Sequence, residues 1–278
     1  MNPPILNIST YRFVPLDELP ALRERLFKAA DARQLKGTVL IAEEGINLFL
    51  AGPEAAVREW LAELRADPRF AGLDAKESFS AEVPFKRLKV KVKAEIIRMN
   101  MPAIRPVAGR APAVTPATLA RWLAQGHDDE QRPVVMLDTR NDFEVDAGAF
   151  DNAIDWRLHK FSEFPAELAA HRDELADKTV VSYCTGGIRC EKAAIVMQQL
   201  GLPHSYQLEG GILRYFEQTD GRAPGWHGRC FVFDERVALD AGHGRAAQAE
   251  RPASSATRSS NTKQRPCQPG ARPSVCSK

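Results

Sequence analysis

Long apolar runs are missing from this sequence of 278 residues. No stretch approaches the roughly 20 apolar residues that a membrane-spanning helix needs, which argues against a transmembrane protein. The first residues also lack the basic start and the apolar stretch of a secretory signal. We therefore expect a cytoplasmic protein with no membrane partner.

Cysteine and aromatic residues are also scarce. The five cysteines are an odd number at irregular positions, which excludes a regular disulfide framework and predicts free thiols: Cys184, Cys190, Cys230, Cys267 and Cys276. They are not paired at metal-ligand spacing such as Cys-x2-Cys, so we predict no metal, and no cofactor is evident. Aromatic residues make up 8% of the chain and do not alternate with basic residues, which gives little support for stacking on nucleic-acid bases.

The net charge of +2 conceals an uneven distribution along the chain. Residues 1–110 carry 18 Lys and Arg against 14 Asp and Glu, whereas residues 111–240 carry 13 against 21. Residues 241–278 carry 7 against 1 and have hardly any large apolar side chain, so we expect a disordered basic tail there. A polyanion would therefore bind the ends of the chain and not its middle.

The first 100 residues alternate strand and helix patterns. Apolar residues recur three and four positions apart over residues 16–34 and again after Pro53, which predicts two helices. Short β-rich runs flank these helices, at residues 5–13, 37–42, 46–50 and 87–93. The order strand, helix, strand, strand, helix, strand is that of the ferredoxin-like split βαβ fold. We therefore expect a ferredoxin-like α+β domain over residues 1–100.

A second domain follows a proline-rich stretch. Four prolines between residues 101 and 116 predict an extended linker over residues 101–115. Beyond the linker, apolar β runs alternate with helical patterns, the runs at 134–137 and 179–183 and the helices at 117–125, 164–175 and 191–200. This alternation predicts an α/β domain with a mainly parallel sheet over residues 116–220.

A cysteine at the end of a predicted strand carries the clearest chemical signal. Cys184 follows the apolar run 179–183, and a short loop then leads into a helix through Thr185, Gly186, Gly187, Ile188 and Arg189. Ligands bind at the carboxyl ends of parallel strands, where loop N–H groups and a helix N-terminus can converge on an anion. These groups and the Arg189 guanidinium favour thiolate, which lowers a cysteine pKa of about 8.5 toward neutrality or below. We predict a nucleophilic thiolate at Cys184.

Other interpretations of this loop are weaker. Its Cys-x4-Arg spacing is one residue shorter than the Cys-x5-Arg loop of cysteine phosphatases, and the smaller cradle suits a persulfide or a single sulfur or oxygen centre. A buried structural cysteine does not explain why strand, loop, arginine and helix coincide. Cys190, six residues after Cys184, could resolve an oxidised or persulfidated Cys184. We favour the simpler interpretation, in which Cys190 is a small residue packed at the helix start.

Two further charged residues belong to the candidate site. Asp138 and Arg140 directly follow a predicted core strand, and we expect them in the wall of the site. A structural salt bridge between loops explains them at least as well as direct catalysis.

Lysines alternate with apolar residues in the last predicted strand of the first domain. Lys89, Lys91 and Lys93 should share one face, while Leu88, Val90 and Val92 face the core. The lysines could contact three phosphates of an RNA, or they could only protect an edge strand from aggregation. The sequence leaves both interpretations open.

Taken together, these motifs resemble the rhodanese-containing tRNA uridine hydroxylase family. The Asp-x-Arg pattern, the glutamate after it, the stretch Gly148 to Ala153 and the Cys184 loop resemble a rhodanese-like domain over about residues 116–218. Matching stretches extend from residue 41 into the C-terminal segment 221–240. The resemblance implies oxygen-dependent 5-hydroxylation of the wobble uridine (position 34) of certain tRNAs. It also implies tRNA as the partner, molecular oxygen as co-substrate, and Cys184 as the essential cysteine.

Two other functions remain open. A thiosulfate or persulfide sulfurtransferase would use the same Cys184 without RNA. A non-catalytic scaffold would use only the fold, but inactive versions commonly lose the cysteine. The basic N-terminal domain favours the RNA-modifying enzyme, because a small-molecule sulfurtransferase has no need of it.

Overall fold

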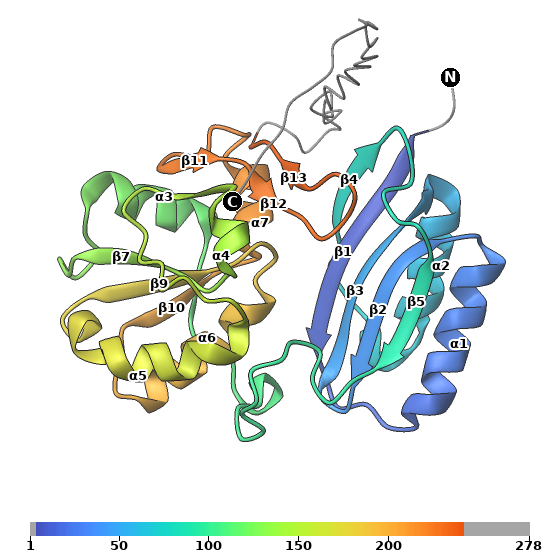
Figure 1. The fold of residues 1–278 in the computed structure, drawn as a ribbon, viewed down its shortest axis with the longest axis horizontal. Helices are drawn as coiled ribbons and strands as arrows, with labels where there is room; N and C mark the ends of the chain where they lie inside the picture. The colour runs from blue at the N-terminus through green and yellow to red at the C-terminus, as the bar shows by residue number, and fades with distance from the viewer. Residues whose placement is uncertain (1–3, 242–278) are drawn as a thin grey trace, which may run out of the picture.

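The computed structural model describes residues 4–241, which form two α/β domains lying side by side (Figure 1). Of the predicted basic tail, residues 242–278 lie outside the described residues. Within the described part of the chain, no helix is both long enough and apolar enough to cross a membrane.

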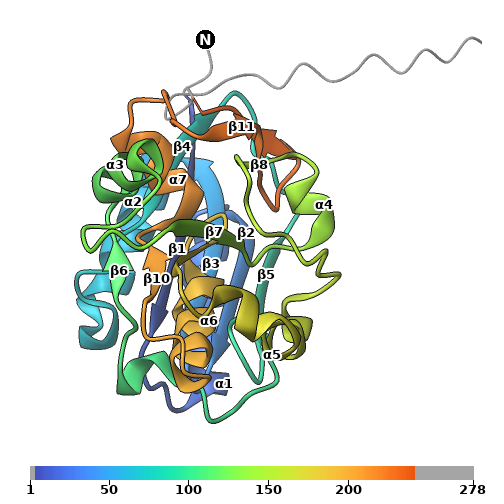
Figure 2. The same cartoon turned by 90° about the vertical axis from the view of Figure 1, so that its left-hand side faces the viewer.

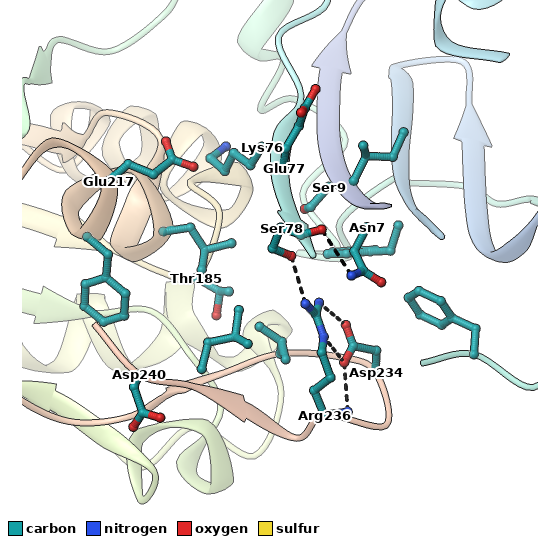
Figure 3. Close-up of a pocket in the computed structure, with 17 residues that line it drawn as sticks. Asn7, Ser9, Lys76, Glu77, Ser78, Thr185, Glu217, Asp234, Arg236 and Asp240 are labelled. Carbon is teal, nitrogen blue, oxygen red and sulfur yellow. Dashed lines mark hydrogen bonds and ion pairs between the residues drawn. The ribbon is translucent and has the colours of Figure 1, made fainter. Parts of the chain in front are cut away.

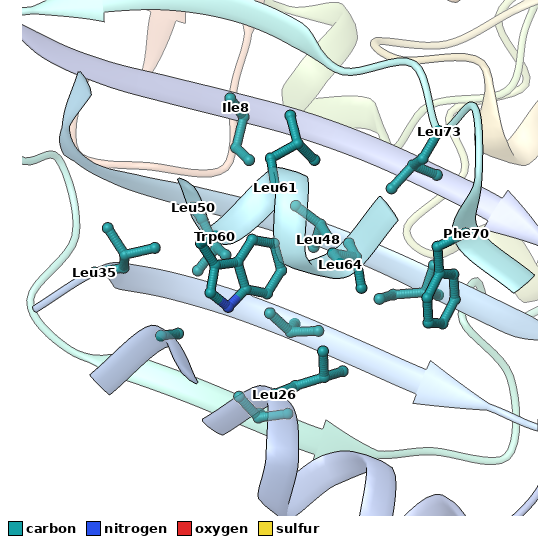
Figure 4. Packing of buried hydrophobic residues seen from close by; sticks show 14 of the residues in the cluster. Ile8, Leu26, Leu35, Leu48, Leu50, Trp60, Leu61, Leu64, Phe70 and Leu73 are labelled. Carbon is teal, nitrogen blue, oxygen red and sulfur yellow. The ribbon is translucent and has the colours of Figure 1, made fainter. Parts of the chain in front are cut away.

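The N-terminal domain is a five-stranded sheet with two helices on one face. Its strand order is β4-β1-β3-β2-β5, from β1 (Ile5–Phe13), β2 (Lys36–Ala42), β3 (Gly45–Pro53), β4 (Lys76–Ser80) and β5 (Leu88–Val92). Helices α1 (Leu19–Ala32) and α2 (Glu54–Ala66) bury alternate strand residues such as Ile8, Leu48 and Leu50 (Figure 4). Because strand side chains alternate between faces, the neighbouring residues Ser9, Asn47 and Phe49 lie on the face without helices.

One expected strand has a different place in this sheet. The strand that completes the ferredoxin-like order is β4, which pairs with β1. The sequence pattern did not reveal β4, because its residues are all half-buried and Phe79 is its one large apolar side chain. The run expected to close the fold, β5, is an additional edge strand parallel to β2. At this edge Val90 is buried, but Val92, which pairs with Ile41 on the same sheet face, is 42% exposed and lies outside the buried core.

The C-terminal domain contains a four-stranded parallel sheet, as predicted. Its order is β6-β10-β9-β7, from β6 (Ala113–Val114), β7 (Val134–Asp138), β9 (Thr179–Tyr183) and β10 (Ser205–Leu208). Helices α3 (Pro116–Gln125) and α7 (Gly211–Gln218) cover one face, and α5 (Phe164–Leu175) and α6 (Ile188–Gln199) cover the other (Figure 2). Burial on both faces explains why β9 is a continuous apolar run, because both sets of alternating side chains meet a core.

The predicted linker is extended but packed. Ile104 and Ala111 are buried in the core of the C-terminal domain, and β6 already belongs to its sheet. The parallel sheet therefore begins a few residues before the expected boundary at residue 116. Short helical turns complete this region and others: α4 (Asp142–Val145), η1 (Pro68–Phe70), η2 (Pro106–Ala108) and η3 (Phe161–Glu163).

The segment after α7 returns to the N-terminal domain. Strand β11 (Trp226–Gly228) pairs with β8 (Gly148–Phe150), and β12 (Cys230–Phe231) pairs with β13 (Ala238–Leu239). Residues 232–237 between β12 and β13, which we call the clasp loop, extend toward β4 (Figure 1). The Glu235 N–H donates to the Pro84 carbonyl at 3.0 Å, and Arg236 Nη1 donates to Ser78 Oγ at 2.8 Å (Figure 3). The clasp loop thus connects the two domains.

The N-terminal core can be tested at Trp60. This side chain is buried between α2 and the sheet, among leucines of both (Figure 4). Replacing Trp60 with alanine should lower the free energy of unfolding by about 3–5 kcal/mol, because a large cavity would remain. Urea unfolding followed by far-ultraviolet circular dichroism measures the loss. Trp156→Ala, at a half-buried tryptophan stacked on His171, is the control and should cost less; equal losses would contradict this placement of the core.

Candidate active site

The sulfur of Cys184 lies where β9 ends and α6 begins. The Gly187 N–H donates a hydrogen bond to Cys184 Sγ at 3.1 Å. Helix α6 starts at Ile188, so Ile188 and Arg189 belong to its first turn and the loop itself consists of residues 184–187. The thiol is therefore next to the positive end of a helix, as the sequence predicted.

A second helix holds the loop in shape. The N–H groups of Ile212 and Leu213, in the first turn of α7, donate to the carbonyls of Cys184 and Thr185 at 3.0 and 3.1 Å. Gly211 has φ +67°, and a Cβ there would lie 2.4 Å from the Cys184 carbonyl oxygen. Only glycine allows α7 to approach this closely. The loop carbonyls thus bind α7, while the Gly187 N–H binds the sulfur.

The surroundings of Cys184 favour the thiolate. Burial alone would raise its pKa, but the neighbouring Cys190 thiol, the Arg189 charge and the N–H groups of Arg189 and Gly187 stabilise the anion. Together they lower the pKa of Cys184 to about 5. Burial and the neighbouring Cys184 thiolate raise the pKa of Cys190, which remains a thiol. Cys190 itself is fully buried in the first turn of α6.

Arg189, which we expected to favour the thiolate, is also paired with an acidic side chain. Its Nη1 and Nη2 atoms bind both oxygens of Glu144 at 2.5 and 2.7 Å, and both side chains are buried. A buried guanidinium needs such a partner to offset its desolvation. Glu144 also accepts a bond from Thr185 Oγ1 at 3.4 Å. The pair therefore connects the turn after β7 to the cysteine loop while its arginine still stabilises the thiolate.

Asp138 and Arg140 lie behind the site and not in its wall. They bind each other at 2.6 to 3.2 Å with no exposed surface, and Arg140 also donates to the carbonyls of Glu144 and Gly148. The Arg140 guanidinium lies over the rings of Tyr183 and Trp226. The structural salt bridge is the interpretation that fits, because a pair with no access to the cleft cannot contact a substrate.

A cleft between the domains leads to Cys184. Its volume is about 730 Å³, and its lining includes Tyr11, Asn47, Phe49 and Lys93 from the N-terminal domain, Lys160, Cys184 and Gly186 from the C-terminal domain, and Phe233 from the clasp loop. Lys91 and Lys89 pair in register with Leu40 and Thr38, so they lie on the same sheet face as Lys93. The predicted lysine face is therefore on the sheet surface that borders the cleft, and Lys93 is the lysine of the three that lines it.

Contacts between the domains reach the cysteine loop itself. Lys76 Nζ, from β4, donates to the Gly186 carbonyl at 3.1 Å. The Tyr11 hydroxyl donates to Glu191 at 3.1 Å, and Lys192 binds Glu44 and Glu95 at 2.9 and 2.7 Å. We had given Glu191 and Lys192 no role, although two charges at the start of a buried helix do indicate partners from outside it. Over residues 4–241, no group of three His, Cys, Asp or Glu side chains could hold a metal ion.

This geometry defines a rhodanese-type protein, with a reactive cysteine at a strand-to-helix junction and an α+β domain over its site. Residues 118–218 match the rhodanese-like domain family, and residues 5–96 match the UPF0176 acylphosphatase-like domain. Both matches agree with the predicted two-part fold.

Curated relatives extend over nearly the whole described chain and are named tRNA uridine(34) hydroxylase. The protein from Delftia acidovorans is 67% identical over 85% of this chain and 89% of its own length. Those from Bordetella petrii and Bordetella avium are 64% and 63% identical, over 86% and 85% of this chain and 94% and 97% of theirs. The chain belongs to the tRNA uridine(34) hydroxylase family.

The ionisation of Cys184 can be measured directly. The Cys184 thiolate absorbs at 240 nm, and its signal is the absorbance of the protein minus that of the Cys184→Ser variant. This difference should rise with increasing pH, with a midpoint at about pH 5. Cys190→Ala should move this midpoint upward, because the thiolate loses the neighbouring thiol that stabilises it. Cys230→Ala is the control: burial raises the pKa of Cys230 to about 12, so its loss should leave the midpoint unchanged. A midpoint near the ordinary value of about 8.5 would contradict the proposed stabilisation.

Proposed function

We propose that this chain is an oxidoreductase that hydroxylates uridine 34 of tRNA, with Cys184 as its reactive residue. The observation that carries the proposal is the position of the Cys184 thiolate in a cleft whose opposite wall includes Lys93 and belongs to the sheet face of Lys89 and Lys91. A polyanion would be attracted to that wall, and a base turned out of an RNA loop would reach the sulfur through the cleft. The shared name of the curated relatives supports the same reaction.

The residues around Cys184 have distinct roles in this proposal. The Gly187 N–H and the Cys190 thiol hold the sulfur as a thiolate, which is the nucleophilic form of cysteine. Thr185 and Gly186 form the loop that presents it, and Lys76 fixes that loop against the N-terminal domain. Molecular oxygen is the co-substrate that the family resemblance implies, and the product carries one hydroxyl group at C5 of the uracil ring.

A sulfurtransferase would use the same thiolate to carry a persulfide. That function needs only the cysteine loop and access for a small sulfur donor. It gives no reason for the lysine face that borders the cleft, nor for Lys76 of that domain to bind the loop. These two features favour the RNA substrate.

The reaction is tested by comparing the protein with Cys184→Ser. Unmodified tRNA is incubated with each under air and under nitrogen, and 5-hydroxyuridine is measured by mass spectrometry. We expect product only from the unaltered protein in air, because serine stays protonated at neutral pH and cannot replace a thiolate. Cys230→Ser is the matched control, at a buried cysteine outside the cleft lining, and should retain activity.

Each alternative predicts a different result in that experiment. Full activity of Cys184→Ser would exclude the thiolate mechanism, and equal product under nitrogen would exclude molecular oxygen. Thiocyanate formation from thiosulfate and cyanide, without any tRNA product, would assign the chain to the sulfurtransferases.

The lysine face is tested by replacing Lys89, Lys91 and Lys93 with glutamine together. Binding of tRNA should weaken most at low salt, and the slope of log Kd against log salt should fall by about two to three, because each of the three lost phosphate contacts removes roughly 0.7 to 0.9 from the slope. Filter binding at several salt concentrations measures this. Lys28→Gln, on α1 at the helix-covered face of the sheet, is the control. Unchanged affinity of the triple variant would leave these lysines a role in solubility alone.

A further inference from the structure

An exposed aromatic ring stands at the rim of the cleft that contains Cys184. Phe233, in the clasp loop, is 47% exposed and lines the cleft together with Cys184. Phe143 of α4 is 45% exposed, and its ring centroid lies 6.5 Å from that of Phe233. Phe231 and Phe49 support Phe233 from β12 and β3, at 5.3 and 6.5 Å. Four elements from both domains therefore meet in one aromatic cluster that is open to solvent.

The exposure of Phe233 does not come from a loosely held loop. On one side of it Val232 is buried, and on the other the Asp234 carboxylate binds Arg236 through two hydrogen bonds, at 2.5 and 2.9 Å. Arg236 continues to Ser78 of the N-terminal domain, as Figure 3 shows. A ring held in water by a well-bonded loop suits a flat apolar partner that covers it on binding.

The charges near this ring favour an anionic partner. Lys93, Arg98 and Lys160 line the same cleft, and the one acidic residue among its lining side chains, Glu95, is bound to Lys192. Lys160 lies 3.6 Å from Glu163, but this exposed ion pair is weak and leaves the Lys160 ammonium group able to bind a ligand. A single-stranded nucleic acid has both properties that this surface suits: its backbone is negatively charged, and its flat bases stack on aromatic rings.

We propose that Phe233 is a stacking platform for a nucleobase next to the uridine that enters the cleft. The inference rests on the proposed function and adds a binding site to it. Stacking on Phe233 would hold the RNA loop at the rim, while the cleft lysine and arginine side chains bind its phosphates and the neighbouring uridine extends toward Cys184. Base stacking had little support in the sequence because Phe49, Phe143 and Phe233 are far apart in the chain and come together only in the fold.

The platform is tested with anticodon stem-loop RNA and three variants. Phe233→Ala should weaken binding about 5- to 150-fold, the range that one stacked base contributes. Phe233→Trp should keep the affinity of the original protein, and its added fluorescence should be quenched when the RNA binds. Val237→Ala is the matched control: Val237 is 57% exposed in the same loop but does not line the cleft, so affinity should not change.

Abasic RNA shows whether the lost affinity is stacking. Stem-loops lacking the base on either side of position 34 are bound to the original protein and to Phe233→Ala. At the stacked position, the abasic RNA should bind both proteins equally, because the ring has no base to contact. Affinity of Phe233→Ala equal to that of the original protein would overturn the platform, as would an equal loss in Val237→Ala.

The binding measurements separate this inference from the proposed function. Failure of the original protein to form 5-hydroxyuridine would overturn the reaction. If that inactive protein still bound the RNA, and if Phe233→Ala weakened this binding, the platform would still be supported. Normal hydroxylation by Phe233→Ala, with unchanged KM for the stem-loop, would overturn the platform and leave the reaction standing.

Discussion

The first turn of α6 holds the cysteine and the two domains in one arrangement. Four consecutive residues there, Arg189, Cys190, Glu191 and Lys192, are buried, and each has a partner on a different element. Successive helical side chains point about 100° apart, so one turn can reach the loop, the linker and the neighbouring domain together. Arg189 binds α4, Glu191 binds the linker and β1, and Lys192 binds the N-terminal domain. Removing one partner of such a pair would leave a buried charge uncompensated, which costs about 3–5 kcal/mol.

This arrangement makes the chemistry of Cys184 depend on both domains. The thiolate is stabilised by Cys190 and Arg189 from within the C-terminal domain, and the loop that presents it is held by Lys76 from the other. The cleft above it exists because the sheet face opposite is left without helices. A substrate in that cleft would contact two surfaces whose relative position is determined by buried ion pairs and by the clasp loop. The N-terminal domain therefore contributes to the geometry of the site as well as to its charge.

Sequence patterns succeeded where the determining contacts are local. The parallel sheet, α3, α5 and the strand-to-helix junction at Cys184 follow from apolar periodicity over short windows, which is how the chain itself forms these elements. The pattern failed at β4, whose half-buried residues alternate weakly. It also placed Asp138 and Arg140 in the site wall, because their position after a strand does not say which way the side chains turn.

The sequence by itself determined the fold class and the position of Cys184 at a strand-to-helix junction, because a cysteine between an apolar strand and a helix start needs only its chain neighbours to acquire N–H donors and a helix dipole. The tertiary structure decided what surrounds that group. Arg189 meets Glu144 from 45 positions away, and Lys192 meets Glu44 from 148 positions away. Phe233 likewise reaches the cleft only because the clasp loop returns to β4. Such contacts depend on how complete elements pack, and side chains that are distant in the chain leave no periodic pattern from which their meeting could be predicted.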